Sequence, residues 1–307
     1  MDIFLQQIIN GLVQGSIYAL VALGYTMVYG IMGLINFAHG EVVMIGTLVT
    51  ITVAGSLIKA GMPVTLAGLA GVSVSVMVCM ALGWGLERIA YRPLRNAPRL
   101  TPLITAIGMS IVLQNMAMII WGRNYMTFPP LLPKMNFEVA GAHFTAVQVI
   151  IVLVSTLTMA GLLLLVYRTK LGMAMRATAQ NPAVASLMGV NINRVIAAAF
   201  VIGSALGAVA GVMVGTYYEI AHYQMGFMLG LKAFTAAVLG GIGNLGGAMA
   251  GGILLGLIEA LGAGYIGDLT GGFLGSHYQD IFAFIVLIVV LMFKPSGLFG
   301  EKTGDRA

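Results

Sequence analysis

Three residues that could handle protons or polar solutes lie close together between two long apolar runs: Asn36, His39 and Glu41. Ionisable side chains at membrane depth are costly, so they commonly mark transport paths or proton relays. The alternative is that these are ordinary turn residues at a membrane edge. The sequence therefore makes Asn36, His39 and Glu41 candidates for a translocation pathway, with the turn interpretation left open.

Other polar side chains interrupt the apolar runs singly. Lys232 and Glu259 lie near the ends of one run, where a structural ion pair or snorkelling of the charged groups to the interface is expected. Gln114 and Asn115 fall inside another run and favour hydrogen bonds between helices over contact with a substrate.

Motifs for enzymatic chemistry are absent from the sequence. The four histidines form no H-x-x-x-H pair and no H-E-x-x-H motif, so no metal site and no catalytic residue is predicted. No G-x-S-x-G or G-x-x-x-x-G-K-[ST] occurs either. The chain is therefore not expected to be an enzyme or to need a cofactor, and any dependence on ATP must come from a partner.

The connector 168–194 is long for a plain turn. Ala, Met and Leu favour a helix in its first part, and Asn181 with Pro182 predicts the start of a second short helix that Gly189 can end. A short helix that exposes Ala, Leu and Met could dock a partner. It could equally rest on the membrane surface as an amphipathic helix.

Long apolar runs occupy most of the chain, which is 59% hydrophobic and 8% charged, with a mean hydropathy of +0.99. About 20 apolar residues are needed for a helix to cross the roughly 30 Å hydrocarbon layer. Because the runs are continuous and do not alternate, barrel strands are not expected. We predict an all-α polytopic membrane protein, a single transmembrane domain over 1–307 with eight or nine helical segments. The runs are 3–38, 42–58, 60–86, 100–122, 144–167, 195–218, 233–258 and 281–293.

Basic residues indicate the orientation of these spans. Short connectors rich in Lys and Arg stay on the cytoplasmic side, so the net charge of +5 reflects membrane topology and does not indicate nucleic-acid binding. The side of the N-terminus stays open. The basic connectors are 88–99, 168–194 and the tail with Lys294, Lys302 and Arg306, and the external ones are 123–143, 217–228 and 262–280.

Glycines predict both a break and a packing face. The stretch 240–247 is rich in glycine inside an apolar run, which predicts a tight helical hairpin or re-entrant pair over 229–262. Small residues spaced four apart line one helix face and allow another backbone to approach closely. Internal packing is the expected role, and a subunit interface or moving seam is the alternative. The residues with this spacing are Gly203, Gly207, Gly211 and Gly215.

Six sequence blocks are distinctive when taken together: 24–30, 35–41, 87–95, 106–110, 187–191 and 232–243. They resemble one family, the permeases of branched-chain amino acid ABC importers. The similarity extends over nearly the whole chain in the same order, and is strongest to the first of the two non-identical permeases. The chain departs from it at Met173, where similar permeases often carry arginine after glycine.

The resemblance implies an inner-membrane subunit with several partners. These are two cytoplasmic ABC ATPase subunits, a second homologous permease and a periplasmic substrate-binding protein, in addition to the lipid bilayer. Leucine, isoleucine and valine are the implied substrates, with other amino acids, urea or short amides as alternatives. The implied ATPase-coupling segment includes Gly172, Arg176, Ala177, Asn181, Ala185, Leu187, Gly189 and Asn191.

Two other classes of function are compatible with a polytopic chain. An ion- or proton-coupled secondary transporter or channel would work without ATPases and often carries inverted repeats with polar residues at the midplane. An intramembrane enzyme would use His39 and Glu41. The missing nucleophile and metal patterns make the enzyme the remoter of the two.

Overall fold

The structure is a computed structural model that describes residues 2–95, 97–98, 100–132, 135–139, 141–269 and 279–300. Arg99, the tail with Lys302 and Arg306, and residues 270–278 of the connector 262–280 lie outside the described residues.

Nine apolar helices account for most of the described chain, and this confirms the predicted all-α polytopic fold. Seven are long and apolar enough to cross a membrane, and α9 and α11 are shorter. They are α1 (Asp2–Met32), α2 (His39–Lys59), α3 (Val64–Gly85), α4 (Leu100–Trp121), α5 (Ala146–Arg168), α8 (Ile192–Tyr218), α9 (Met225–Gly240), α10 (Leu245–Leu269) and α11 (Gln279–Phe293).

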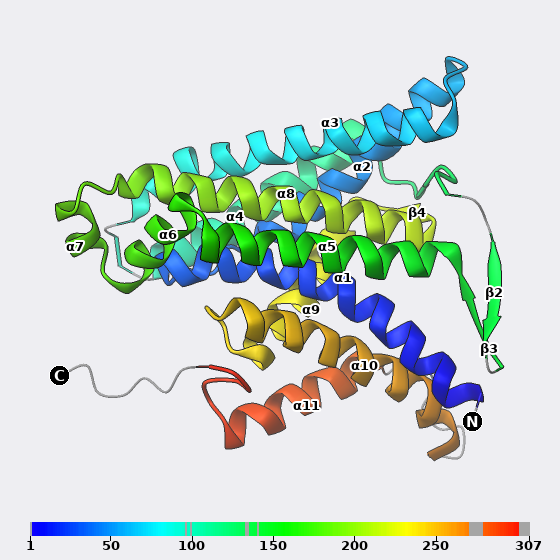
Figure 1. The fold of residues 1–307 in the computed structure, drawn as a ribbon. Helices are drawn as coiled ribbons and strands as arrows, with labels where there is room; N and C mark the ends of the chain where they lie inside the picture. Colours follow the sequence, from blue (N-terminus) through cyan, green and yellow to red (C-terminus); the bar gives the residue numbers. More distant parts are fainter. Residues whose placement is uncertain are drawn as a thin grey trace.

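Short elements gather at the two ends of the bundle. At one end lie α6 (Lys170–Gln180) and α7 (Pro182–Leu187), with the turns η1 (Leu86–Tyr91) and η2 (Arg92–Leu94) following α3. Two small antiparallel ladders lie at the opposite end (Figure 1). One pairs β1 (Met126–Thr127) with β4 (Ile220–Ala221), and the other pairs β2 (Asn136–Val139) with β3 (Ala142–Thr145).

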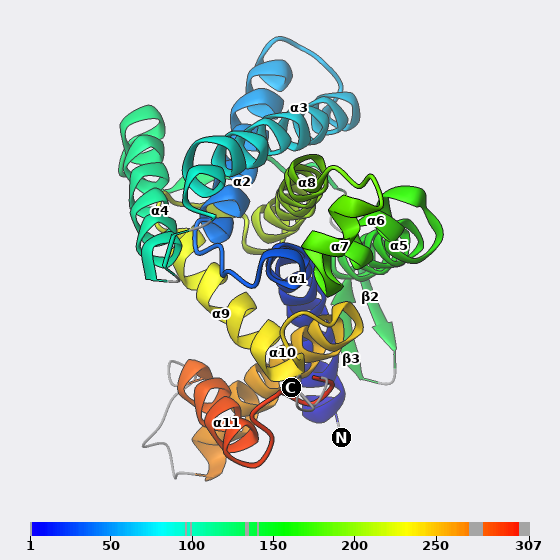
Figure 2. The ribbon, with the colours of Figure 1, turned by 90° about the vertical axis from the view of Figure 1, so that its left-hand side faces the viewer.

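The interior of the bundle is built from α1, α2 and α8, most of whose side chains are buried, whereas α3, α4 and α5 bury only about a quarter of theirs. Seen end-on, α1 is surrounded by α8, α9 and α10 (Figure 2). Lipid offers no hydrophobic gain for bringing helices together, so close packing of small residues must do this. Gly252 and Gly256 of α10 accordingly lie against Ala19 and Gly15 of α1.

All the described basic connectors lie at the end that carries α6 and α7. Arg95 of the first connector donates to Asn193, at the start of α8, and Phe299 of the tail accepts from Asn244. Since basic connectors tend to stay in the cytoplasm, we expect this end to be the cytoplasmic one. α1 begins at the opposite end (Figure 1), so the same rule predicts an external N-terminus.

Between α1 and α2 the chain turns back, and α2 begins inside the bundle. α1 ends at Met32, and α2 then runs back in the opposite direction. His39, the first residue of α2, lies against Gly24 of α1. Gly24 precedes Met32 by eight residues, which is roughly 12 Å along a helix. α2 therefore begins part-way through the bilayer, not at its surface.

The glycine-rich stretch forms the turn of a helical hairpin, as predicted. α9 ends at Gly240 and α10 begins at Leu245. Gly241 and Gly243 adopt φ of +109° and +97°, a backbone conformation that residues with a side chain rarely adopt. The tail holds this turn in place, because the amide of Phe299 donates to the Gly240 carbonyl. The hairpin turn thus lies at the cytoplasmic end.

The four spaced glycines of α8 face the interior of this chain. They allow α1 and α2 to approach the α8 backbone closely, and Thr47 of α2 donates to the Gly211 carbonyl at 2.8 Å. Gly203 lies against Gly24, Gly207 against His39, Gly211 against Val43, and Gly215 against Phe128.

We expect Gly211→Ala to lower the thermal unfolding midpoint of the purified protein. A Cβ at Gly211 would overlap the Val43 carbonyl oxygen, and overpacking of this kind costs about 1–3 kcal/mol. The better helix propensity of alanine offsets only up to about 1 kcal/mol of that. Gly161→Ala in α5 is the matched control, because a Cβ added there would have no neighbouring atom within 4 Å. Equal midpoints for the two variants would contradict the packing role.

Candidate functional site

The predicted pathway residues are buried at the start of α2. Asn36 lies in the linker before α2, and His39 and Glu41 lie in its first turn. The side-chain amide oxygen of Asn36 accepts from the Tyr91 hydroxyl at 2.8 Å, and the Tyr91 ring packs on Phe200 of α8. These contacts fix the linker against η1 and α8.

Glu41 connects three helices. Its Oε1 accepts from the Ser110 hydroxyl of α4 at 3.0 Å. Its Oε2 has no hydrogen-bond partner among the described residues and lies against Gly226, in the first turn of α9. The amino end of a helix carries partial positive charge, so this position favours a carboxylate.

His39 fills the space that glycines leave between α1 and α8. Its ring lies against Gly24 and Gly207 and meets the edge of Tyr25 at 5.0 Å between ring centroids. No hydrogen bond joins His39 to Glu41 within the described residues, and these residues contain no group of three potential metal ligands. The geometry supports packing by His39 and supplies no direct proton relay.

A cavity of about 650 Å³ lies between α1, α4 and α9. None of Asn36, His39 and Glu41 lines it, but residues in contact with them do. Sequence reasoning assigned no role to Tyr25, Phe37 and Ser110, although all three fall in or beside the blocks that resemble the permease family. The lining residues are Tyr25, Phe37, Ile107, Ser110, Ile111, Gln114, Gln224, Phe227, Met228 and Leu231.

This cavity is mainly apolar, with a few polar groups at one edge, which is the usual composition of a site for a small organic ligand. Gln114 faces it, whereas Asn115 donates to the Ile111 carbonyl of its own helix at 2.8 Å. The prediction of an interhelical hydrogen bond is therefore wrong for Asn115, because its side chain is exposed on the outer face of α4.

Lys232 and Glu259 form the structural ion pair that the sequence suggested. The Lys232 ammonium lies 3.2 Å from Oε2 of Glu259, which also accepts from the Tyr18 hydroxyl at 2.7 Å. The pair joins α9 to α10 and α1 inside the bundle.

The connector 168–194 folds into two capped helices, as predicted. The Asn181 side chain accepts from the Val184 amide, Pro182 occupies the first position of α7, and Gly189 follows with φ of +86°. Asn191 caps α8 in the same way, by accepting from the Arg194 amide at 3.1 Å. The caps set α6 and α7 at a fixed angle to the membrane helices.

The connector 168–194 contains both buried residues that pack on the bundle and exposed apolar residues. Gly172 lies against the carbonyls of Leu165 and Val166, and Ala185 is buried. Leu187 and Met188 project, with 86% and 80% of their surface exposed. Of the other predicted residues, Ala177 is half-buried and Arg176 lies over the Tyr167 ring.

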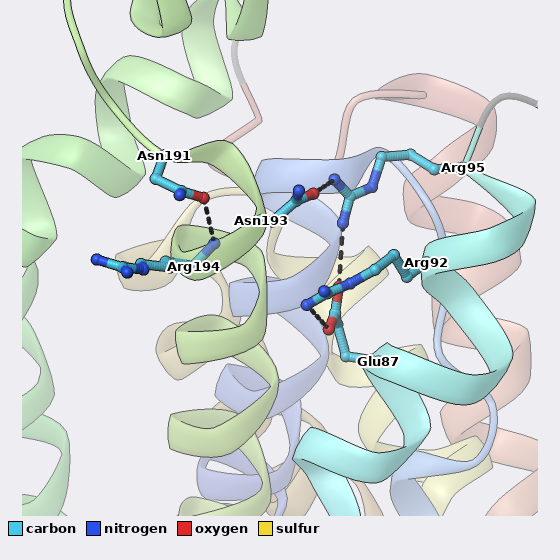
Figure 3. A network of polar contacts seen from close by, with 6 residues as sticks. All are labelled: Glu87, Arg92, Arg95, Asn191, Asn193 and Arg194. Atoms are coloured by element: carbon cyan, nitrogen blue, oxygen red, sulfur yellow. Dashed lines mark hydrogen bonds and ion pairs between the residues drawn. The ribbon is translucent and has the colours of Figure 1, made fainter.

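A network of charges joins this connector to the basic one (Figure 3). The carboxylate of Glu87, a fully buried residue of η1, accepts two hydrogen bonds from Arg92 and one from Arg95. Arg95 also donates to Asn193 at 2.7 Å, two residues after Asn191. Burial lowers the pKa of the Arg95 guanidinium, which the Glu87 carboxylate opposes, and the group stays charged.

Comparisons with known proteins agree over nearly the whole chain. Residues 7–291 match the family described as branched-chain amino acid transport system / permease component. The high-affinity branched-chain amino acid transport system permease proteins BraD of Pseudomonas aeruginosa and LivH of Escherichia coli K12 are 48% and 46% identical. Each alignment covers 99% of this chain, and the aligned part makes up 98% of BraD and 97% of LivH. A probable branched-chain amino acid transport permease protein of Methanocaldococcus jannaschii is 27% identical, over 97% of this chain and 94% of that protein.

We expect Glu87→Gln to destabilise the cytoplasmic end of the bundle. The neutral amide leaves Arg92 and Arg95 without their carboxylate, and hydrogen bonds to charged groups contribute about 1.5–3 kcal/mol. The thermal unfolding midpoint in detergent should fall by several degrees. Glu138→Gln in the exposed strand β2 is the control and should leave the midpoint unchanged. A midpoint equal to that of the control would show that the network adds no stability.

Proposed function

The chain belongs to the family of branched-chain amino acid transport permeases, and on this premise we propose that it forms part of the translocation path for leucine, isoleucine and valine in an ATP-driven importer. The family match over residues 7–291 carries this proposal. The helices long enough to span a membrane place the chain in the bilayer, which we take to be the bacterial inner membrane.

Energy is proposed to come from separate subunits. The sequence carries no phosphate-binding loop, so ATP hydrolysis requires two cytoplasmic ATPase subunits. A second, homologous permease completes the membrane part, and a periplasmic binding protein supplies the substrate at the opposite end. The family's description as the permease component of a transport system supports the presence of further subunits.

The connector with α6 and α7 is proposed as the ATPase-coupling segment. It lies at the cytoplasmic end and presents Leu187 and Met188, which a groove on an ATPase subunit could bury. Ala185 and the caps at Asn181 and Asn191 hold this apolar tip on the membrane helices. Movement of the tip would reach α8 directly and reach α3 through the Glu87 network.

The cavity between α1, α4 and α9 is proposed as part of the path. Its apolar walls suit a branched side chain, and its polar edge at Ser110 and Gln114 suits the charged groups of an amino acid. His39 and Glu41 would act from behind this wall, through Tyr25 and Ser110 respectively. Asn36, which Tyr91 holds in place, directly precedes the lining residue Phe37. Since α2 and α9 both begin beside Glu41, a shift of either helix would change the polar edge.

Co-purification tests the assembly. The tagged chain, solubilised gently from its native membrane, should recover two P-loop ATPases and a second polytopic permease by mass spectrometry. Leu187→Asp should reduce ATPase recovery at least about tenfold, because burying an unpaired charge costs more than about 1.4 kcal/mol. Met135→Asp, an exposed apolar residue at the opposite end, should not reduce it.

A single polytopic protein or homo-oligomer, under conditions that preserve a known ABC importer, would contradict the assembly. The secondary transporter or channel would then be favoured, and transport by the purified chain alone would identify it. Normal ATPase recovery by Leu187→Asp, with uptake intact, would contradict only the coupling segment.

Leucine uptake tests the pathway. Ser110→Ala removes the hydrogen bond to the buried Glu41 carboxylate, and bonds to charged groups contribute about 1.5–3 kcal/mol. We expect uptake by the reconstituted importer to fall at least about tenfold, with subunit assembly unchanged. Ser73→Ala is the control, because Ser73 is exposed and bonds its own helix. Uptake at the wild-type rate by Ser110→Ala would exclude this role.

A further inference from the structure

A second pocket lies at the outer end of the bundle, on the other side of α9. It holds about 250 Å³ between α1, α8, α9 and the segment around the β1–β4 ladder. Tyr18, Tyr125, Tyr218, His222 and Lys232 supply its polar groups, and the rest of its lining is apolar. None of these five residues lines the cavity between α1, α4 and α9.

Lys232 faces this pocket with its counter-ion behind it. The Lys232 side chain is 14% exposed and lines the pocket, whereas the Glu259 side chain is 1% exposed and does not. The ammonium also lies 3.4 Å from the Tyr18 hydroxyl and 5.7 Å from the centre of the Tyr18 ring. The positive end of the ion pair therefore points toward the pocket, beside a phenolic hydroxyl.

Stability alone does not account for an ion pair at this place. Removing two charges from water costs several kcal/mol for each ion, and well-packed apolar residues of similar volume often serve as well or better. Ionisable residues inside membrane segments mark sites that handle charged solutes. The aromatic and apolar lining would moreover strengthen any charge–charge contact in the pocket by excluding water.

We propose that the outer pocket binds the carboxylate of an incoming amino acid through the Lys232 ammonium, beside the Tyr18 hydroxyl that donates to Glu259. Glu259 balances the ammonium while the pocket is empty. The apolar walls formed by Val214, Met225 and Leu229 receive the side chain. This inference rests on the proposed function, and it adds a recognition site for one chemical group on the outer side.

The two cavities share one wall. Met228 of α9 lines both the outer pocket and the cavity between α1, α4 and α9. A solute held at Lys232 would therefore be separated from the inner cavity by α9 alone. The two sites therefore lie on opposite faces of α9, at a similar depth along that helix.

Charge-selective thiol labelling tests the site directly. The test uses the assembled importer in lipid, with a new cysteine at Ile220, which lines the pocket and is 48% exposed. Cys79, the one native cysteine of this chain, is replaced by alanine in this background. An anionic sulfonatoethyl and a cationic trimethylammonioethyl methanethiosulfonate are compared, and the mass of this chain reports modification. Met135→Cys, at the same end but outside the pocket, is the control.

We expect the anionic reagent to be favoured at Ile220→Cys by about tenfold relative to its preference at Met135→Cys. Lys232→Met should remove this preference, and Lys232→Arg should keep it. Leucine should slow labelling at Ile220→Cys, whereas leucinamide, which lacks the carboxylate, should not. If the Lys232→Met variant does not assemble, the double variant Lys232→Met with Glu259→Gln is used in its place. The double variant leaves no unpaired buried charge.

Equal charge preference at the two cysteines, or a preference that persists without Lys232, would overturn the proposal. Equal protection by leucine and leucinamide would overturn it as well. Failure of the wild-type importer to accumulate leucine with ATP would instead overturn the proposed function, and it is measured separately on the same proteoliposomes. The two failures are therefore distinguishable.

Discussion

Close approach of helix backbones is the constraint on which the rest of this structure depends. In lipid, helices are held by packing and polar contacts, and these require small residues at the seams. Glycines of α8 admit α1 and α2, and those of α10 admit α1. The imidazole of His39 fits only because Gly24 and Gly207 leave room for it. The same close packing brings the starts of α2 and α9 together beside Glu41.

The position of α9 organises the polar interior. Its first turn lies at the depth where α2 begins, and its two sides line different cavities. One side offers the polar edge at Ser110 and Gln114 across the space to α4, and the other offers Lys232. α9 therefore separates the two cavities.

Charge networks link the cytoplasmic surface to this interior. The caps at Asn181 and Asn191 fix α7 to α8, and Arg95 extends that link from Asn193 to Glu87 of η1, which follows α3 directly (Figure 3). α3 in turn packs on α2 and α8. A force applied at Leu187 would therefore be distributed over the helices that hold Asn36 and Glu41. The geometry suits a permease that is driven from outside the membrane.

The sequence by itself determined the helical membrane fold, the hairpin at 240–247 and the capped helices of 168–194. Each of these depends on local composition, on glycine conformation or on caps within a few residues. Only the tertiary structure decided that His39 packs against glycines, that Ser110 and not Glu41 lines a cavity, and that Arg95 joins Glu87 to Asn193. Such pairings depend on the rotation and depth of helices far apart in the chain, which hydrophobic length does not specify.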